Sequence, residues 1–64
     1  MSAARIYTVG NGQRTQVAMR ADGVWFVRHM WRGRWGKWDS VGKKRPFEFG
    51  MYEAPRAGLA RLPD

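Results

Sequence analysis

The sequence predicts an all-β fold, a small antiparallel four- to five-stranded meander sheet or SH3-like barrel whose C-terminal segment covers one face. Glycines and turn dipeptides divide the first two thirds of the chain into short segments. These segments are rich in β-branched and aromatic residues, which are typical of strands. No segment keeps a helical spacing of apolar residues over the length of an amphipathic helix. Together these observations favour strands joined by tight turns.

The first two strands are predicted at residues 5–9 and 15–20, where apolar and polar side chains alternate. Asn11-Gly12 lies between them. This pair is the one most favoured in a two-residue type I′ turn, because both central residues of that turn need a positive φ. Such a turn places Ile6 opposite Val17.

The third and fourth strands are predicted at residues 24–31 and 35–41. Asp22-Gly23 precedes the third strand and has the same turn chemistry, which places Met19 opposite Phe26.

The turn between the third and fourth strands has two candidate positions. A loop at Gly33-Arg34 sets Arg28 opposite Asp39, whereas a loop at Arg32-Gly33 sets Arg28 opposite Lys37. Because like charges directly opposite each other destabilise a sheet, we favour the loop at Gly33-Arg34.

These registers divide the side chains between two faces of the sheet, because side chains alternate along a strand. The first, predicted to be the core face, collects Ile6, Thr8, Thr15, Val17, Met19, Val24, Phe26, Arg28, Met30 and Val41. The second collects Arg5, Tyr7, Val9, Arg14, Gln16, Ala18, Arg20, Trp25, Val27, His29, Trp31 and Trp38.

The remaining residues are predicted to cover the sheet. Residues 42–46 form a basic linker, and residues 47–52 alternate well enough for a fifth strand or form an irregular cover. Residues 56–62 are expected to be mostly loop, because Gly58 weakens a helix there and Pro63 ends it. The whole chain, residues 1–64, is expected to be a single small β domain with its sheet at about residues 5–41.

Composition excludes several kinds of protein. The chain has no cysteine, which excludes disulfides, thiol catalysis and cysteine-based zinc sites and is typical of a cytoplasmic protein. No apolar run approaches the length of a membrane-spanning helix, and the start of the chain leads into a strand-like segment rather than an apolar signal core. We therefore expect a cytoplasmic protein that does not bind membranes.

An enzymatic function is not expected. His29 is the single histidine, and the five carboxylates are dispersed along the chain. Residues 42–44 lack the glycine loop and the hydroxyl residue of a phosphate-binding loop. No metal, cofactor or catalytic residue is therefore predicted.

The second face predicts nucleic-acid binding. Twelve Lys and Arg residues against five Asp and Glu give a formal net charge of +7. Aromatic rings beside guanidinium groups can stack bases and neutralise phosphates, and single-stranded DNA or RNA is favoured over duplex because duplex bases are already stacked. The predicted stacking residues are Tyr7, Trp25, His29, Trp31 and Trp38, and the predicted phosphate-binding residues are Arg5, Arg14, Arg20, Arg32, Arg34, Lys37, Lys43 and Lys44.

The stretch 28–38 is the densest basic and aromatic patch, with four cations and three tryptophans. Within it, Arg34-Trp35-Gly36-Lys37-Trp38 resembles the turn of the three-stranded DNA-reading sheets in plant AP2-type domains and in the arm-binding domains of tyrosine integrases. Those families also pack an amphipathic helix across the sheet. Residues 42–64 predict no such helix, so the chain is not assigned to either family.

Three other interpretations remain open. The tryptophans can instead be core residues of a two-sided sheet, with arginines lying over them. The same Trp and Arg surface can bind an acidic protein, as in a small accessory protein of a phage or mobile element that regulates or inhibits a host protein. The aromatic face can also form the core of a homodimer.

Overall fold

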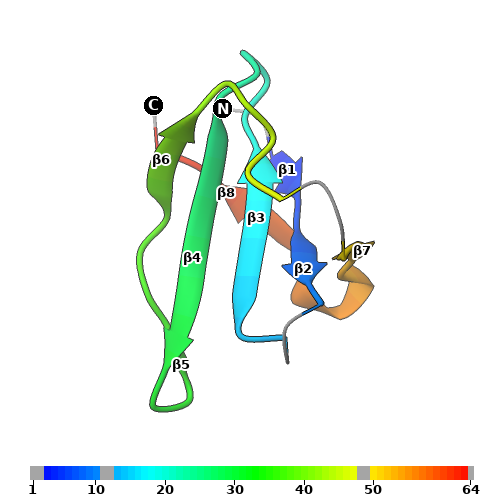
Figure 1. Ribbon diagram of the computed structural model, residues 1–64, viewed down its shortest axis with the longest axis vertical. Helices are drawn as coiled ribbons and strands as arrows, with labels where there is room; N and C mark the ends of the chain where they lie inside the picture. The colour runs from blue at the N-terminus through cyan, green and yellow to red at the C-terminus, as the bar shows by residue number, and fades with distance from the viewer. Residues whose placement is uncertain (1–2, 11–12, 48–49, 64) are drawn as a thin grey trace.

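The computed structural model describes residues 3–10, 13–47 and 50–63 and confirms the all-β prediction (Figure 1). Over these residues it contains strands, one 3₁₀ turn and no α-helix. The strands are β1 (Ala3–Arg5), β2 (Tyr7–Val9), β3 (Thr15–Met19), β4 (Trp25–Trp31), β5 (Arg34–Trp35), β6 (Asp39–Gly42), β7 (Met51–Glu53) and β8 (Leu59–Arg61), and the 3₁₀ turn η1 (Pro55–Ala57) precedes β8.

The main sheet is antiparallel, with the strand order β5-β4-β3-β2-β7 and with β6 also pairing with β4. The predicted meander is therefore present from β2 to β5. The end strands do not pair with each other within the described residues, so this sheet stays open and the SH3-like barrel does not close. β1 and β8 form a separate two-stranded sheet.

Apolar side chains pack on both faces of the main sheet. One face, called here the Phe26 face, carries a buried cluster of Ala4, Ile6, Ala18, Phe26, Ala60 and Leu62. The other, called the Val17 face, carries Val9, Val17 and Val27, with Tyr7, Trp25, Phe47 and Met51 packed against them. In Figure 1, β8 lies behind the sheet and the chain between β6 and Phe47 crosses in front of it. The C-terminal part of the chain thus covers both faces rather than the one predicted.

The predicted register of the first hairpin is wrong by one residue. Tyr7, not Ile6, lies opposite Val17. Ile6 lies between β1 and β2 and is buried in the Phe26-face cluster. Asn11 and Gly12, on which the prediction depended, lie outside the described residues.

The second hairpin also differs by one residue, because its loop is longer than predicted. The Gly23 N–H donates to the Arg20 carbonyl at 2.9 Å and the Arg20 N–H to the Val24 carbonyl at 2.8 Å. Gly23 has φ 90°, so it is the left-handed residue that follows a type I turn in a three-residue loop. Met19 consequently lies opposite Trp25, not Phe26.

These shifts exchange the faces of β3 relative to its neighbours, since a slip of one residue turns every side chain to the other side. Val17 shares a face with Tyr7 and Val27, whereas Ala18 shares one with Phe26. The predicted division into one core face and one aromatic, basic face is therefore wrong. Both faces have a core.

The third turn is at Arg32-Gly33, the alternative that we did not favour. Trp31 lies opposite Arg34, and Arg32 and Gly33 have φ 49° and 78°. The repulsion expected between Arg28 and Lys37 does not arise, because β5 ends at Trp35 and the next strand begins only at Asp39.

β6 pairs with β4 in a shifted register, with Asp39 opposite Val27 and Ser40 opposite Phe26. The prediction that Asp39 lies opposite Arg28 is therefore wrong. Val41, predicted to pack beside Phe26, is exposed.

The C-terminal segment contains more regular structure than expected. The strand predicted over residues 47–52 is confirmed only as β7, which pairs with β2; Glu48 and Phe49 lie outside the described residues. The tail, predicted to be mostly loop, forms η1 and then β8. Ala60 and Leu62 are buried there, so β8, which begins directly after Gly58, is held against the Phe26-face cluster by apolar packing.

The described residues contain no helix of the length and hydropathy that crossing a bilayer requires.

Candidate nucleic-acid interface

The four tryptophans divide between the two faces of the sheet. Trp31 lies opposite Arg34 on the side of Val17, and Trp25 packs against the Val17-face cluster. Trp35 lies opposite Met30 on the other side, and Trp38 packs against the Phe26-face cluster. The prediction that Trp25, Trp31 and Trp38 share one face is therefore wrong, because β6 does not continue the register of β5.

Exposure separates one tryptophan from the others. The Trp31 residue is 74% exposed, whereas Trp25, Trp35 and Trp38 are half-buried. Tyr7, another predicted stacking residue, is also half-buried against the Val17-face cluster. Of the predicted tyrosine and tryptophan stacking residues, only Trp31 is thus exposed.

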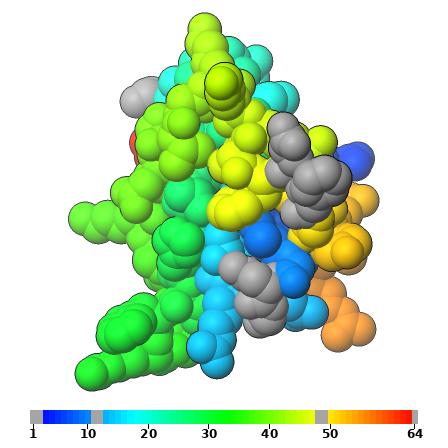
Figure 2. Space-filling view, in the orientation of Figure 1, coloured from blue at the N-terminus to red at the C-terminus, as the bar shows by residue number. Residues whose placement is uncertain are grey.

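Trp31 stands at the end of the β4–β5 hairpin. Arg32 and Gly33 both adopt positive φ, which is the type I′ geometry whose twist matches that of paired strands. This tight turn leaves Trp31, Arg32, Gly33 and Arg34, called here the hairpin tip, projecting beyond the sheet. Figure 2 shows the hairpin (green) extending from the lower end of the molecule.

Three arginines lie close to Trp31 at the hairpin tip. The guanidinium carbon of Arg32 lies 5.9 Å from the centroid of the Trp31 ring. Arg14 joins Met30 and residues 31–33 in lining a hollow of about 420 Å³ beside the tip. Arg34 is paired with Trp31 across the hairpin. The Trp31 ring and three arginines are therefore gathered at one end of the protein.

These cations have no acidic partner in the described part of the chain. Over those residues, ion pairs join only Arg5 to Glu53, at 3.5 Å, and Arg20 to Asp22, at 2.8 Å. The other predicted phosphate-binding residues are exposed and form no ion pair with a described residue: Arg14, Arg32, Arg34, Lys37, Lys43 and Lys44.

Not all of these cations lie at the hairpin tip. Lys43 and Lys44 follow β6, at the opposite end of the sheet in Figure 1. His29 is exposed on β4, and its Nδ1 lies 3.2 Å from the Thr15 hydroxyl oxygen in a hydrogen bond. The structure thus brings together only part of the predicted set.

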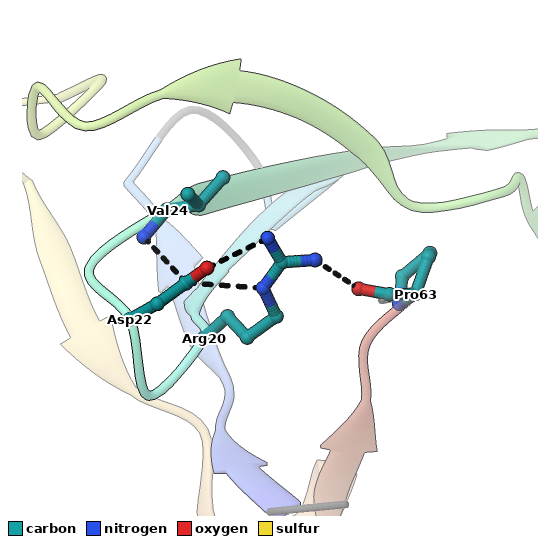
Figure 3. A network of polar contacts seen from close by, with 4 residues as sticks. All are labelled: Arg20, Asp22, Val24 and Pro63. Atoms are coloured by element: carbon teal, nitrogen blue, oxygen red, sulfur yellow. Dashed lines mark hydrogen bonds and ion pairs between the residues drawn. The ribbon is translucent and has the colours of Figure 1, made fainter.

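Arg20 is used within the protein itself (Figure 3). Its guanidinium donates to both carboxylate oxygens of Asp22, at 3.0 and 2.8 Å, and also to the Pro63 carbonyl. The Asp22 carboxylate further accepts from the Val24 N–H at 3.2 Å. Hydrogen bonding by Arg20 and then by the Val24 amide lowers the pKa of Asp22 to about 2. These contacts tie the β3–β4 turn to the C-terminal segment.

Arg28 organises the Phe26 face near the hairpin. Its Nε and Nη2 atoms donate to Oε1 of Gln16, at 2.9 and 2.6 Å. Its guanidinium carbon lies over the rings of Trp35 and Trp38, at 4.8 and 4.6 Å from their centroids. Partial burial lowers the pKa of Arg28. This cluster was not predicted from the sequence, because Arg28 was expected to lie opposite Asp39; the register of the Arg32-Gly33 turn places Trp35 opposite Met30.

A groove of about 400 Å³ opens beside this cluster. Thr8 and Gln16 of the sheet line it, with Met30 and Trp35 from one hairpin and residues 53–57 from the other side. The Thr8 hydroxyl oxygen is buried and has no hydrogen-bond partner among the described residues. The groove was not predicted from the sequence, because it forms between segments that are distant in the chain.

Metal binding has no support in the described residues, where no three His, Asp or Glu side chains come together. Comparisons with protein-family models, with curated proteins and with solved structures found no match to the chain.

Proposed function

We propose that the protein binds single-stranded DNA or RNA through the hairpin tip and Arg14. The observation that carries this proposal is the 74% exposed Trp31, which stands among arginines that pair with no acidic side chain of the described residues. A large exposed indole is unfavourable in water, and unpaired guanidinium groups attract phosphates. Both features are accounted for together by a ligand that has flat rings and a charged backbone.

A single strand fits this surface better than a duplex. Its bases are free to stack on an indole, and each such contact contributes roughly 1–3 kcal/mol. In a duplex the bases are stacked on one another, so the Trp31 ring would have no equivalent partner. The net charge of +7 increases affinity for either ligand without adding sequence preference.

The proposal is tested by titrating the protein into labelled single-stranded DNA, single-stranded RNA and duplex DNA and measuring fluorescence anisotropy. Neutralising three to five phosphates predicts a roughly ten- to hundred-fold loss of affinity between about 50 and 200 mM salt. A single strand should bind most tightly.

Variants of the tip separate stacking from charge. Trp31→Ala should weaken single-strand binding roughly ten-fold or more at either salt concentration. Arg32→Ala combined with Arg34→Ala should also reduce the salt dependence. Tyr52→Ala and Arg61→Ala are matched controls, because both residues are exposed and lie on other strands, β7 and β8. They should leave the affinity close to that of the wild type.

Two results would contradict the proposal. One is the absence of saturable binding to any nucleic acid at low salt. The other is an equal loss of affinity in the tip variants and in the control variants, which would indicate diffuse charge attraction. In either case an acidic protein would become the better candidate partner for the tip, and affinity capture with wild type against Trp31→Ala would identify it.

A further inference from the structure

We propose that the groove beside Arg28 holds one nucleobase of the bound strand, with the edge of the base at Gln16 and Thr8 and its ring against Trp35. This inference rests on the proposed function and specifies a second contact of the same ligand. It is carried by three features: the fixed orientation of the Gln16 amide, the unpartnered hydroxyl of Thr8, and the position of the groove next to the hairpin tip.

Arg28 fixes which end of the Gln16 amide is available. A guanidinium group has only donors, so the Gln16 atom that faces it must be the oxygen, Oε1. Two N–H groups of Arg28 occupy that oxygen, at 2.9 and 2.6 Å. The Gln16 NH₂ group therefore remains as a donor, in a residue that is only 7% exposed and that lines the groove. It matches the carbonyl oxygen or the unprotonated ring nitrogen on a base edge.

Thr8 adds a second polar group whose hydrogen-bonding capacity is unused. Its hydroxyl oxygen is buried without a partner in the described part of the protein, and the residue lines the same groove. Leaving such a group unpaired is costly in a folded protein. A hydroxyl both donates and accepts, so beside the Gln16 donor it can match the donor and acceptor that the Watson–Crick edge of a nucleobase presents.

The side chains that line the groove suit a base that belongs to a negatively charged nucleic acid. Trp35 and Met30 supply an apolar wall, and Arg28 over the Trp35 ring holds the indole in place. Arg56 lines the opposite side and pairs with no acidic residue among those described, so it is placed to meet a phosphate.

Met30 connects the groove with the hairpin tip, because it lines both the groove and the hollow beside Trp31. A nucleic-acid strand that passes around the end of the hairpin can thus place one base on Trp31 and another in the groove on the opposite face of the sheet.

The test compares an oligothymidylate with an abasic oligonucleotide of the same length, both labelled and measured by anisotropy. The abasic strand keeps the phosphates but has no base to occupy the groove. Thr8→Val removes the hydroxyl with little change of shape. Gln16→Glu keeps an acceptor for Arg28 and replaces the NH₂ donor by an oxygen. Each variant should bind oligothymidylate roughly five- to ten-fold more weakly. Thr8→Val should bind the abasic strand like the wild type, and Gln16→Glu should bind it within about two-fold of the wild type, because only the net charge changes.

The melting temperature distinguishes a ligand contact from a structural one. Thr8→Val should melt at the wild-type temperature or above it, since it removes a buried polar group that has no partner. A melting temperature several degrees lower would show that the hydroxyl has a structural role and would overturn its assignment to a base.

The groove proposal and the proposed function can be contradicted separately. If both groove variants bind oligothymidylate like the wild type while Trp31→Ala weakens it, the groove proposal is wrong and the proposed function stands. If the wild-type protein binds neither oligonucleotide, both are wrong.

Discussion

The two turns at the ends of β4 contain similar residues and are used differently. At one end, Arg20 lies over the Phe26 ring, with its guanidinium carbon 5.2 Å from the centroid. At the other end, Arg32 lies 5.9 Å from the centroid of the Trp31 ring. Each turn also contains a glycine with positive φ, Gly23 or Gly33. Composition alone does not distinguish them.

Their partners do. Arg20 donates to Asp22 and to the Pro63 carbonyl, so its charge and its donors are engaged within the fold. Arg32 has no carboxylate partner among the described residues, and the ring beneath it is exposed rather than buried. An arginine beside an aromatic ring therefore stabilises the fold where a carboxylate and buried apolar side chains are near. Where both are missing, such an arginine can contact a ligand.

Arg28 lies between the two turns and provides the largest expected effect. Arg28→Ala would leave the Gln16 carbonyl oxygen without its donor and remove the guanidinium over Trp35 and Trp38. We expect a loss of about 2–3 kcal/mol in the free energy of unfolding, measured by urea denaturation. Arg34→Ala, an exposed arginine a few residues along, is the matched control and should change it by less than about 0.5 kcal/mol. If the two variants lost equal amounts of unfolding free energy, Arg28 would contribute no more to the fold than an exposed arginine does.

A smaller effect is expected at the β3–β4 turn. Arg20→Ala removes the contacts that join this turn to the C-terminal segment and the packing over Phe26. The midpoint of thermal unfolding should fall by roughly 5 °C. The affinity for single-stranded DNA should stay within about two-fold, because only the net charge changes. Arg32→Ala should show the reverse pattern, and a loss of affinity in Arg20→Ala as large as in Arg32→Ala would remove the distinction between the turns.

The pH dependence of stability gives a further test of the hydrogen bonds between Arg20 and Asp22 in the β3–β4 turn. The hydrogen bonds from Arg20 and Val24 lower the folded-state pKa of Asp22 from 3.8 to about 2. A carboxylate with a lowered pKa stabilises the fold fully above its unfolded pKa and loses that contribution as the pH falls through the folded one. The difference in melting temperature between wild type and Asp22→Asn should therefore be largest above about pH 4 and shrink toward pH 2. A difference that does not change over this range would show that Asp22 is not paired in solution.

The sequence predicted the fold class because its signals are local. Short β-branched segments separated by turn dipeptides favour strands even when their packing partners are not known. The registers of the strands were harder to predict. Gly23 can belong to either a two-residue or a three-residue loop, and these two loops give registers that differ by one residue. Burial did not decide between them, since Val17 and Ala18 are both fully buried, on opposite faces of the same strand.

The candidate site likewise has a part that the sequence predicted and a part that it did not. The hairpin tip was predicted because Trp31, Arg32 and Arg34 are neighbours in the sequence. The groove was not, because Thr8, Gln16 and Trp35 meet only through three successive strand pairings, β2 with β3, β3 with β4 and β4 with β5. Arg28 was predicted to lie opposite Asp39, but its guanidinium donates instead to the neutral amide of Gln16, directly opposite on β3.

The smallest expected effect separates stability from binding at a single residue. Arg32 has φ 49°, a conformation that costs an ordinary side chain energy and that asparagine adopts more easily. Asn-Gly is also the preferred pair of a type I′ turn. Arg32→Asn should therefore raise the free energy of unfolding by about 0.5 kcal/mol while weakening single-strand binding several-fold, because one phosphate contact is lost. Denaturation and anisotropy on the same sample would show the two changes with opposite signs. At Arg20 the same measurements should move stability alone, so a tip variant that lost stability and kept its affinity would reverse the roles assigned to the two turns.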